Sequence, residues 1–257
     1  MLIVAALQAA FGAFLLIRPQ LILDLWPFPG TTELTFLFLA SIFAAAAGST
    51  AWSALLGEPA SYGGIALDYL AIFGPMAVYL IVLEPARGGG ASAFLLALLV
   101  TCGFGVWLFW RTYRLPLTDP RPTPRPLLAS FVAFVLLLLV TSGVLLANVP
   151  NILPWLVTPE LSVIAGLIFL GAATYFAYAL LRRGWSNAGG QLAGFLAYDL
   201  VLILPLLARI PSVPDKWRLS LVVYIAILLS SGTLAAWYLF GNRVTRISSR
   251  RPPFEGG

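Results

Sequence analysis

The sequence predicts an all-α integral membrane protein with eight transmembrane helices arranged as two parallel four-helix repeats. Of its 257 residues, 60 % are hydrophobic and only 10 % are charged, and the mean hydropathy is +0.95. A soluble domain carries about 25 % charged residues. These values predict the membrane class, and the recurrence of one pattern in both halves of the chain predicts the repeats.

Eight apolar segments approach the length of about 20 residues that a helix needs to cross the hydrocarbon core. Backbone polar groups have no partners in lipid, and no alternating pattern indicates a barrel, so each segment is expected to be helical. The first is short and could extend toward Leu25, with Arg18 reaching the headgroups. The segments are 2–17, 34–56, 62–83, 92–110, 127–147, 161–181, 191–208 and 219–240.

A proline-rich run separates two halves that resemble each other. Asp68 recurs 131 residues later as Asp199, and Glu33 recurs 127 residues later as Glu160. Because each half holds an even number of segments, both copies should run the same way across the bilayer. The predicted units are a first repeat over 1–115, a linker over 116–126, a second repeat over 127–247 and a tail over 248–257.

The basic residues predict the orientation. With a cytoplasmic N-terminus, ten basic residues lie inside and five outside, and the opposite orientation reverses this ratio. Short cytoplasmic loops are enriched in arginine and lysine, so both termini and the linker are expected in the cytoplasm. Lys216 is the only lysine, and this preference for arginine favours a bacterial inner or plasma membrane.

Asp68 and Asp199 are the two ionisable residues expected well inside the membrane. On a helix, Gly64, Asp68, Pro75 and Tyr79 fall within about 40° of one line. One face then carries the carboxylate of Asp68, the hydroxyl of Tyr79 and a glycine without a side chain. It also carries a proline, which leaves a backbone carbonyl of the helix without its hydrogen bond. These residues form a candidate substrate- or proton-binding site with Asp199 as the second acid, although Asp199 is surrounded by apolar residues.

Two functional hypotheses follow from the paired acids. The first is a small-solute or proton-linked transporter or permease with Asp68 and Asp199 at the repeat interface. In the second, each acid makes one hydrogen bond to a neighbouring helix and fixes its packing. The chain would then be a non-catalytic membrane subunit that packs against other transmembrane proteins or binds lipid or pigment.

Other classes are excluded by what the sequence lacks. It has no histidine and one cysteine, so no metal site or cofactor is expected. Tyr198-Asp199 resembles the first half of the motif of presenilin-like intramembrane aspartic proteases. However, Asp68 follows Ile-Ala-Leu, not Gly-x-Gly, and no Pro-Ala-Leu occurs. We therefore expect no enzyme. The net charge is +5, and the basic residues that cause it lie between and after the apolar segments. This position indicates the lipid bilayer as their partner and not nucleic acid.

Overall fold

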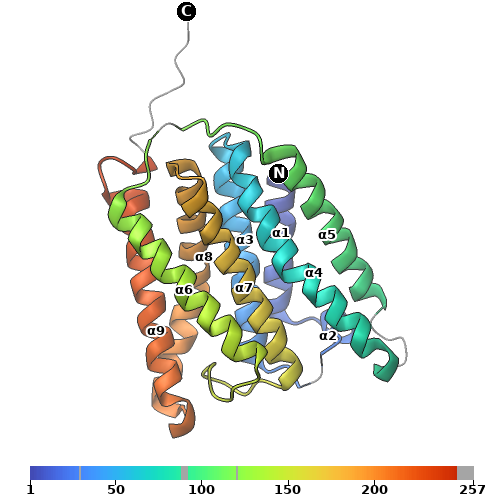
Figure 1. The fold of residues 1–257 in the computed structure, drawn as a ribbon. Helices are drawn as coiled ribbons and strands as arrows, with labels where there is room; N and C mark the ends of the chain where they lie inside the picture. Colours follow the sequence, from blue (N-terminus) through green and yellow to red (C-terminus); the bar gives the residue numbers. More distant parts are fainter. Residues whose placement is uncertain (29, 88–91, 120, 248–257) are drawn as a thin grey trace, which may run out of the picture.

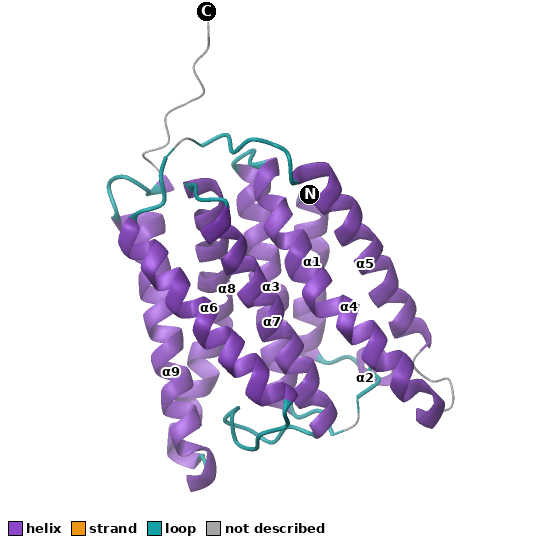
Figure 2. Cartoon of the chain, in the orientation of Figure 1, coloured by secondary structure: helices purple, strands orange, loops and turns teal. Residues whose placement is uncertain are grey.

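The computed structural model describes residues 1–28, 30–87, 92–119 and 121–247. All the regular secondary structure in this described part of the chain is helical, and it contains no strand (Figure 2). Seven of its helices are long and apolar enough to cross a membrane, as expected of a polytopic membrane protein. They are α3 (Glu33–Leu55), α4 (Tyr62–Arg87), α5 (Ser92–Thr112), α6 (Arg125–Leu146), α7 (Pro159–Leu181), α8 (Trp185–Arg209) and α9 (Asp215–Ala236).

The remaining helices are shorter. They are α1 (Leu2–Ile17), α2 (Gln20–Leu25), the 3-10 turns η1 (Pro59–Ser61) and η2 (Ile210–Ser212), and the π-helical turn η3 (Trp237–Gly241). The eight predicted segments thus all form helices, but the first is shorter than a perpendicular span requires. The predicted tail, 248–257, lies outside the described residues.

The possible extension of the first segment toward Leu25 is wrong. Arg18 closes α1 in the left-handed conformation, with φ 54°, and its N–H donates to the carbonyl of Phe14. Pro19 follows and has no N–H to continue the helix. A separate helix, α2, therefore starts at Gln20, and Arg18 pairs with Glu33 at 2.6 Å near the start of α3.

Equivalent caps start α3 and α7. The hydroxyl of Thr32 accepts a hydrogen bond from the N–H of Thr35, and the hydroxyl of Thr158 accepts one from Leu161, both at 3.3 Å. Each cap satisfies one of the backbone donors that a helix start leaves unpaired. Glu33 and Glu160 lie in the first turns, where a carboxylate suits the helix dipole.

The helices form a central group and an outer group (Figure 1). In the centre, α3 packs on α8 and α4 packs on α7. On the outside, α1 and α5 pack on α3 and α4, while α6 and α9 pack on α7 and α8. Each outer helix consequently leaves much of its apolar surface exposed, in contact with lipid once the chain is in a bilayer.

Glycines allow α3 and α8 to approach closely. A β-carbon built on Gly48 would lie 3.0 Å from the carbonyl oxygen of Ala193. One built on Gly194 would lie 2.3 Å from the hydroxyl of Ser49 and 3.1 Å from the carbonyl oxygen of Ala45. Neither position has room for a side chain, so this interface depends on backbone-to-backbone packing.

The same requirement explains why α8 starts six residues before the predicted segment at 191. The Gly189-Gly190 pair does not interrupt the helix, because it faces α3 at close range. A β-carbon on Gly189 would lie 2.8 Å from Nε1 of Trp52, and one on Gly190 would lie 3.3 Å from the hydroxyl of Ser53. Here the glycines are contact residues of a helix and not its boundary.

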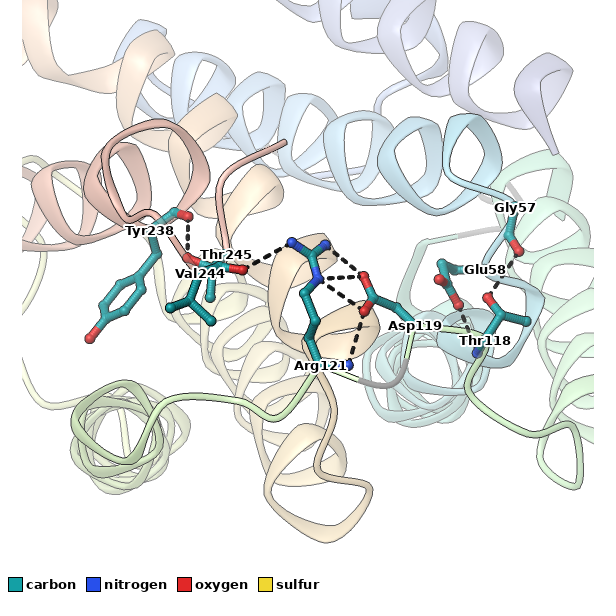
Figure 3. A network of polar contacts seen from close by, with 8 residues as sticks. All are labelled: Gly57, Glu58, Thr118, Asp119, Arg121, Tyr238, Val244 and Thr245. Atoms are coloured by element: carbon teal, nitrogen blue, oxygen red, sulfur yellow. Dashed lines mark hydrogen bonds and ion pairs between the residues drawn. The ribbon is translucent and has the colours of Figure 1, made fainter. Parts of the chain in front are cut away.

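The proline-rich linker crosses one end of the bundle and binds its turns. The backbone N–H of Thr118 donates to the buried carboxylate of Glu58 at 3.2 Å, before α4 (Figure 3). Arg121 pairs with Asp119 at 2.6 Å and donates to the carbonyl of Val244 at 3.1 Å, after α9. Its own carbonyl accepts from the N–H of Trp185, at the start of α8.

Arg182, at the end of α7, completes these contacts. Its guanidinium donates to the carbonyls of Tyr113 and Leu115 at 3.1 and 2.6 Å. The linker and the residues just before it are therefore hydrogen-bonded to the turn between α3 and α4, the turn between α7 and α8, and the segment after α9. The start of α1 lies at this same end of the bundle (Figure 1).

Replacing Gly48 by leucine is expected to disrupt the α3–α8 contact. Overpacking a tight site costs about 1–3 kcal/mol, so thermal unfolding of the purified protein in detergent should shift to lower temperature. Gly103→Leu on α5 is the matched control, because a β-carbon there meets nothing within 4 Å. Equal melting of the two variants would contradict the close approach.

Candidate functional site

A cavity of about 550 Å³ lies among α3, α4, α6, α7, α8 and α9. Small-molecule sites commonly have this size and a largely apolar lining. Most of its lining residues are aliphatic or aromatic. The four central helices contribute five polar side chains to the lining, namely Ser49, Asp68, Tyr175, Gln191 and Tyr198. The other polar lining residues are Thr141 of α6, Asn151 of the following loop, and Ser220, Tyr224 and Ser231 of α9.

Asp68 reaches the cavity because of its position on α4. Ile65, Asp68 and Ile72 follow the spacing of one helix face, and all three line the cavity. Asp68 also faces Gly171 of α7, since a β-carbon there would lie 2.6 Å from Oδ1 of the carboxylate. Gly171 therefore leaves the space that the carboxylate occupies, and any larger residue would displace it.

The Asp68 carboxylate makes no hydrogen bond or ion pair with any residue that the structure describes. Its polar neighbours are the side chains of Tyr69 and Tyr175, which interact with it electrostatically. Of these, the Tyr69 hydroxyl is already hydrogen-bonded to Gln8 of α1. A charge held at membrane depth without a partner is costly, so such a residue points to a functional role.

Gln191 and Tyr175 add further polar atoms without partners. The amide of Gln191 donates to the backbone carbonyl of Tyr175 at 2.6 Å, while its Oε1 is buried and lacks a partner among the described residues. The Tyr175 hydroxyl lies beside Ser49 but makes no hydrogen bond of good geometry. Ser49 instead donates to the carbonyl of Gly190 at 2.9 Å. Unsatisfied buried groups are rare and call for an explanation.

Asp199 has a different environment. It is 4 % exposed and is not among the residues that line the cavity. The hydroxyl of Ser231 on α9 lies 2.9 and 3.1 Å from its two carboxylate oxygens. Gly232 makes room for the pair, since a β-carbon there would lie 3.2 Å from Oδ2. Asp199 is thus hydrogen-bonded to one neighbouring helix.

Tyr198 and Tyr224 form the part of the cavity wall that is next to Asp199. Both line the cavity, their hydroxyls are hydrogen-bonded to each other, and both interact electrostatically with Asp199. Asp199 contacts α9, whereas Asp68 contacts α7. The two acids therefore occupy different interfaces, and only Asp68 lines the cavity.

The other predicted site residues do not line the cavity. Gly64 packs under the rings of Tyr175 and Tyr178, Pro75 is exposed and Tyr79 is partly buried. Gly64 and Pro75 share a face with Asp68 but are about 16 Å apart along the axis, at 1.5 Å per residue. Over that length the neighbours of α4 change, so a common face does not give a common environment.

Ser49, Tyr175 and Gln191 were not predicted from the sequence. They are uncharged side chains in segments that remain strongly apolar, so they do not stand out as an acid such as Asp68 does. One sequence feature could have indicated Ser49 and Gln191, namely that both α3 and α8 contain small and polar residues close together. In the structure Ser49 faces Gly194, and Gln191 directly follows Gly190.

No group of three or more metal-ligating side chains occurs within the described ranges. The chain matches no protein family, no curated protein and no solved structure. Function is therefore inferred from the cavity and from the polar groups that line it.

The two acids should respond differently to truncation. Asp199→Ala removes a buried, hydrogen-bonded group and should cost about 1–3 kcal/mol, which lowers the melting temperature in detergent. Asp68→Ala removes a carboxylate without hydrogen bonds, so the melting temperature should stay constant or rise. A loss of stability with Asp68→Ala as large as with Asp199→Ala would identify Asp68 as a structural residue.

Proposed function

We propose that the chain is a small-solute or proton-linked transporter, a permease in which Asp68 binds the transported solute or proton. The observation that carries this proposal is an acid without a hydrogen-bond partner on the wall of a cavity at membrane depth. A residue that only fixes helix packing has its hydrogen bonds satisfied, as Asp199 does. Asp199 is accordingly assigned the packing role and Asp68 the functional one.

We further propose that the scaffold is an internal repeat. The helix pairs support this, because exchanging α1, α3, α4 and α5 for α6, α7, α8 and α9 leaves the packing pattern unchanged. The α3–α8 pair then corresponds to α7–α4, and the Thr32 cap corresponds to the Thr158 cap. Solute sites of transporters commonly lie near the midplane between such repeats.

The repeat describes the scaffold better than it describes the site. Under this exchange Asp199 would face α3, yet it contacts Ser231 and Gly232 of α9. In the first repeat the acid, Asp68, lies beside the cavity. In the second repeat the acid, Asp199, is hydrogen-bonded to the adjacent helix α9. A binding site with one acid is consistent with this arrangement.

The end of the bundle that carries the linker is proposed to be cytoplasmic. Reporter domains fused near Thr123 and after Gly257 should both be found in the cytoplasm, because ten of the fifteen basic residues belong to this side. Protease protection of intact cells or spheroplasts is the measurement. Export of both reporters would reverse the orientation, and export of only one would show that the number of spans is wrong.

Transport is tested with purified protein in vesicles that contain a pH-sensitive dye. A panel of small solutes is added under an imposed proton gradient, and solute-dependent proton movement is expected for wild type. Asp68→Asn should abolish it, since the amide cannot exchange a proton or pair with a cation at neutral pH. Asp199→Asn is the matched control and should retain it.

Identical traces for wild type and Asp68→Asn across the panel would contradict the transporter proposal. That result would favour the membrane-subunit hypothesis instead. Thermal melting of both variants in the same detergent separates a loss of transport from a loss of folding.

A further inference from the structure

The chemistry of the cavity changes along its length. At one end Asp68, Tyr175 and Gln191 lie together, joined by the hydrogen bond from Gln191 to Tyr175 and by the electrostatic contact between Tyr175 and Asp68. Away from this polar cluster, the rest of the lining is mostly aliphatic and aromatic. Its polar groups include the hydroxyls of Tyr198 and Tyr224, which are hydrogen-bonded to each other, and the side chains of Thr141 and Ser231. The cavity thus has a polar head region that holds the acceptors without partners, and a largely apolar remainder, which we call the apolar body.

The apolar body reaches the lipid-facing surface between α6 and α9. Leu137 and Val140 of α6 line the cavity and are also exposed, as are Leu219 and Val223 of α9. At the linker end the two helices are joined through a buried cluster that includes Phe131 of α6. Beyond it they separate toward the opposite end of the bundle (Figure 1).

The mouth of the cavity is bordered by polar groups only near one end of the membrane-spanning helices. There the hydroxyl of Ser220 donates to the backbone carbonyl of Asn151, and both residues belong to the lining. Along the rest of the mouth the exposed residues are aliphatic. A ligand dissolved in the bilayer can reach the cavity directly through this side opening.

The polar cluster selects the charge of the ligand. The Asp68 carboxylate and Gln191 Oε1 are acceptors without partners among the described residues, so they require a donor. An ammonium group supplies up to three donors and a positive charge. The described residues that line the cavity include no arginine or lysine, so a phospholipid phosphate would find no cationic partner among them.

We propose that this cavity binds a lipophilic amine, a molecule with an apolar body and one protonated amine, which comes from the bilayer between α6 and α9. The ammonium pairs with Asp68 and donates to Gln191 Oε1, and the apolar body fills the cavity toward α6 and α9. The inference rests on the proposed function in taking Asp68 as the binding residue, and it adds the ligand class and the route.

Binding is measured in phosphatidylcholine nanodiscs with a long-chain alkylamine that carries a dansyl group at the end remote from the amine. A saturable rise in dansyl fluorescence is expected with wild type, and at least ten-fold weaker binding with Asp68→Asn. The matching alcohol, which lacks the charge, should bind weakly and equally to both proteins. The full-length chain is used throughout.

The route is tested by narrowing the mouth while Asp68 stays intact. Val223→Trp should slow association of the amine at least five-fold. Leu229→Trp, on an exposed position of α9 outside the cavity lining, should leave the rate unchanged. Equal rates for the two variants would overturn the side opening.

Absence of saturable amine binding to wild type, or equal binding to wild type and Asp68→Asn, would overturn the ligand class. These results are separable from the transport test, because binding in nanodiscs requires no movement across a membrane. Solute-driven proton movement that depends on Asp68, without amine binding, would keep the transporter and reject this inference. Amine binding that depends on Asp68, without proton movement, would keep this inference and reject the transporter.

Discussion

The hydrocarbon core offers no hydrogen-bond partners, and the structure follows from this constraint. Every spanning segment is a helix because only a helix satisfies its own backbone. Polar side chains in these helices must find partners inside the protein, as Ser49 does with the carbonyl of Gly190 and Asp199 does with Ser231. In such a setting an acid that lacks a partner, Asp68, is the exception that needs a reason.

The two intramembrane acids have similar sequence surroundings and different environments in the fold. Small residues on the neighbouring helices determine this difference in environment. Gly171 gives Asp68 its space beside the cavity, and Gly232 brings α9 close enough for Ser231 to reach Asp199. The Ser231 hydroxyl also lies 2.8 Å from the carbonyl of Ile227. Because it has one hydrogen to donate, both contacts are satisfied together when Asp199 carries its own proton.

The helical membrane class and seven of the spans could be predicted from hydropathy alone, because the bilayer leaves so few alternatives. The end of α1 could also have been read from Arg18-Pro19. The start of α8 could not, since Gly189-Gly190 looks like a boundary until Trp52 is placed against it. Of the residues predicted as a binding site, only Asp68 lines the cavity. The polar lining residues Tyr175 and Gln191 come from helices more than 100 residues away, and no local pattern identifies them.

The linker has a mechanical consequence for the whole bundle. It ties together the turn at Glu58, the start of α8 and the segment at Val244, so these points keep fixed separations at one end. At the other end of the gap between α6 and α9, the hydrogen bond from the hydroxyl of Ser220 to the carbonyl of Asn151 joins α9 to the loop after α6. Any widening of this gap must pivot about the linker, and it must break the bond between Ser220 and Asn151 at the opposite side of the membrane.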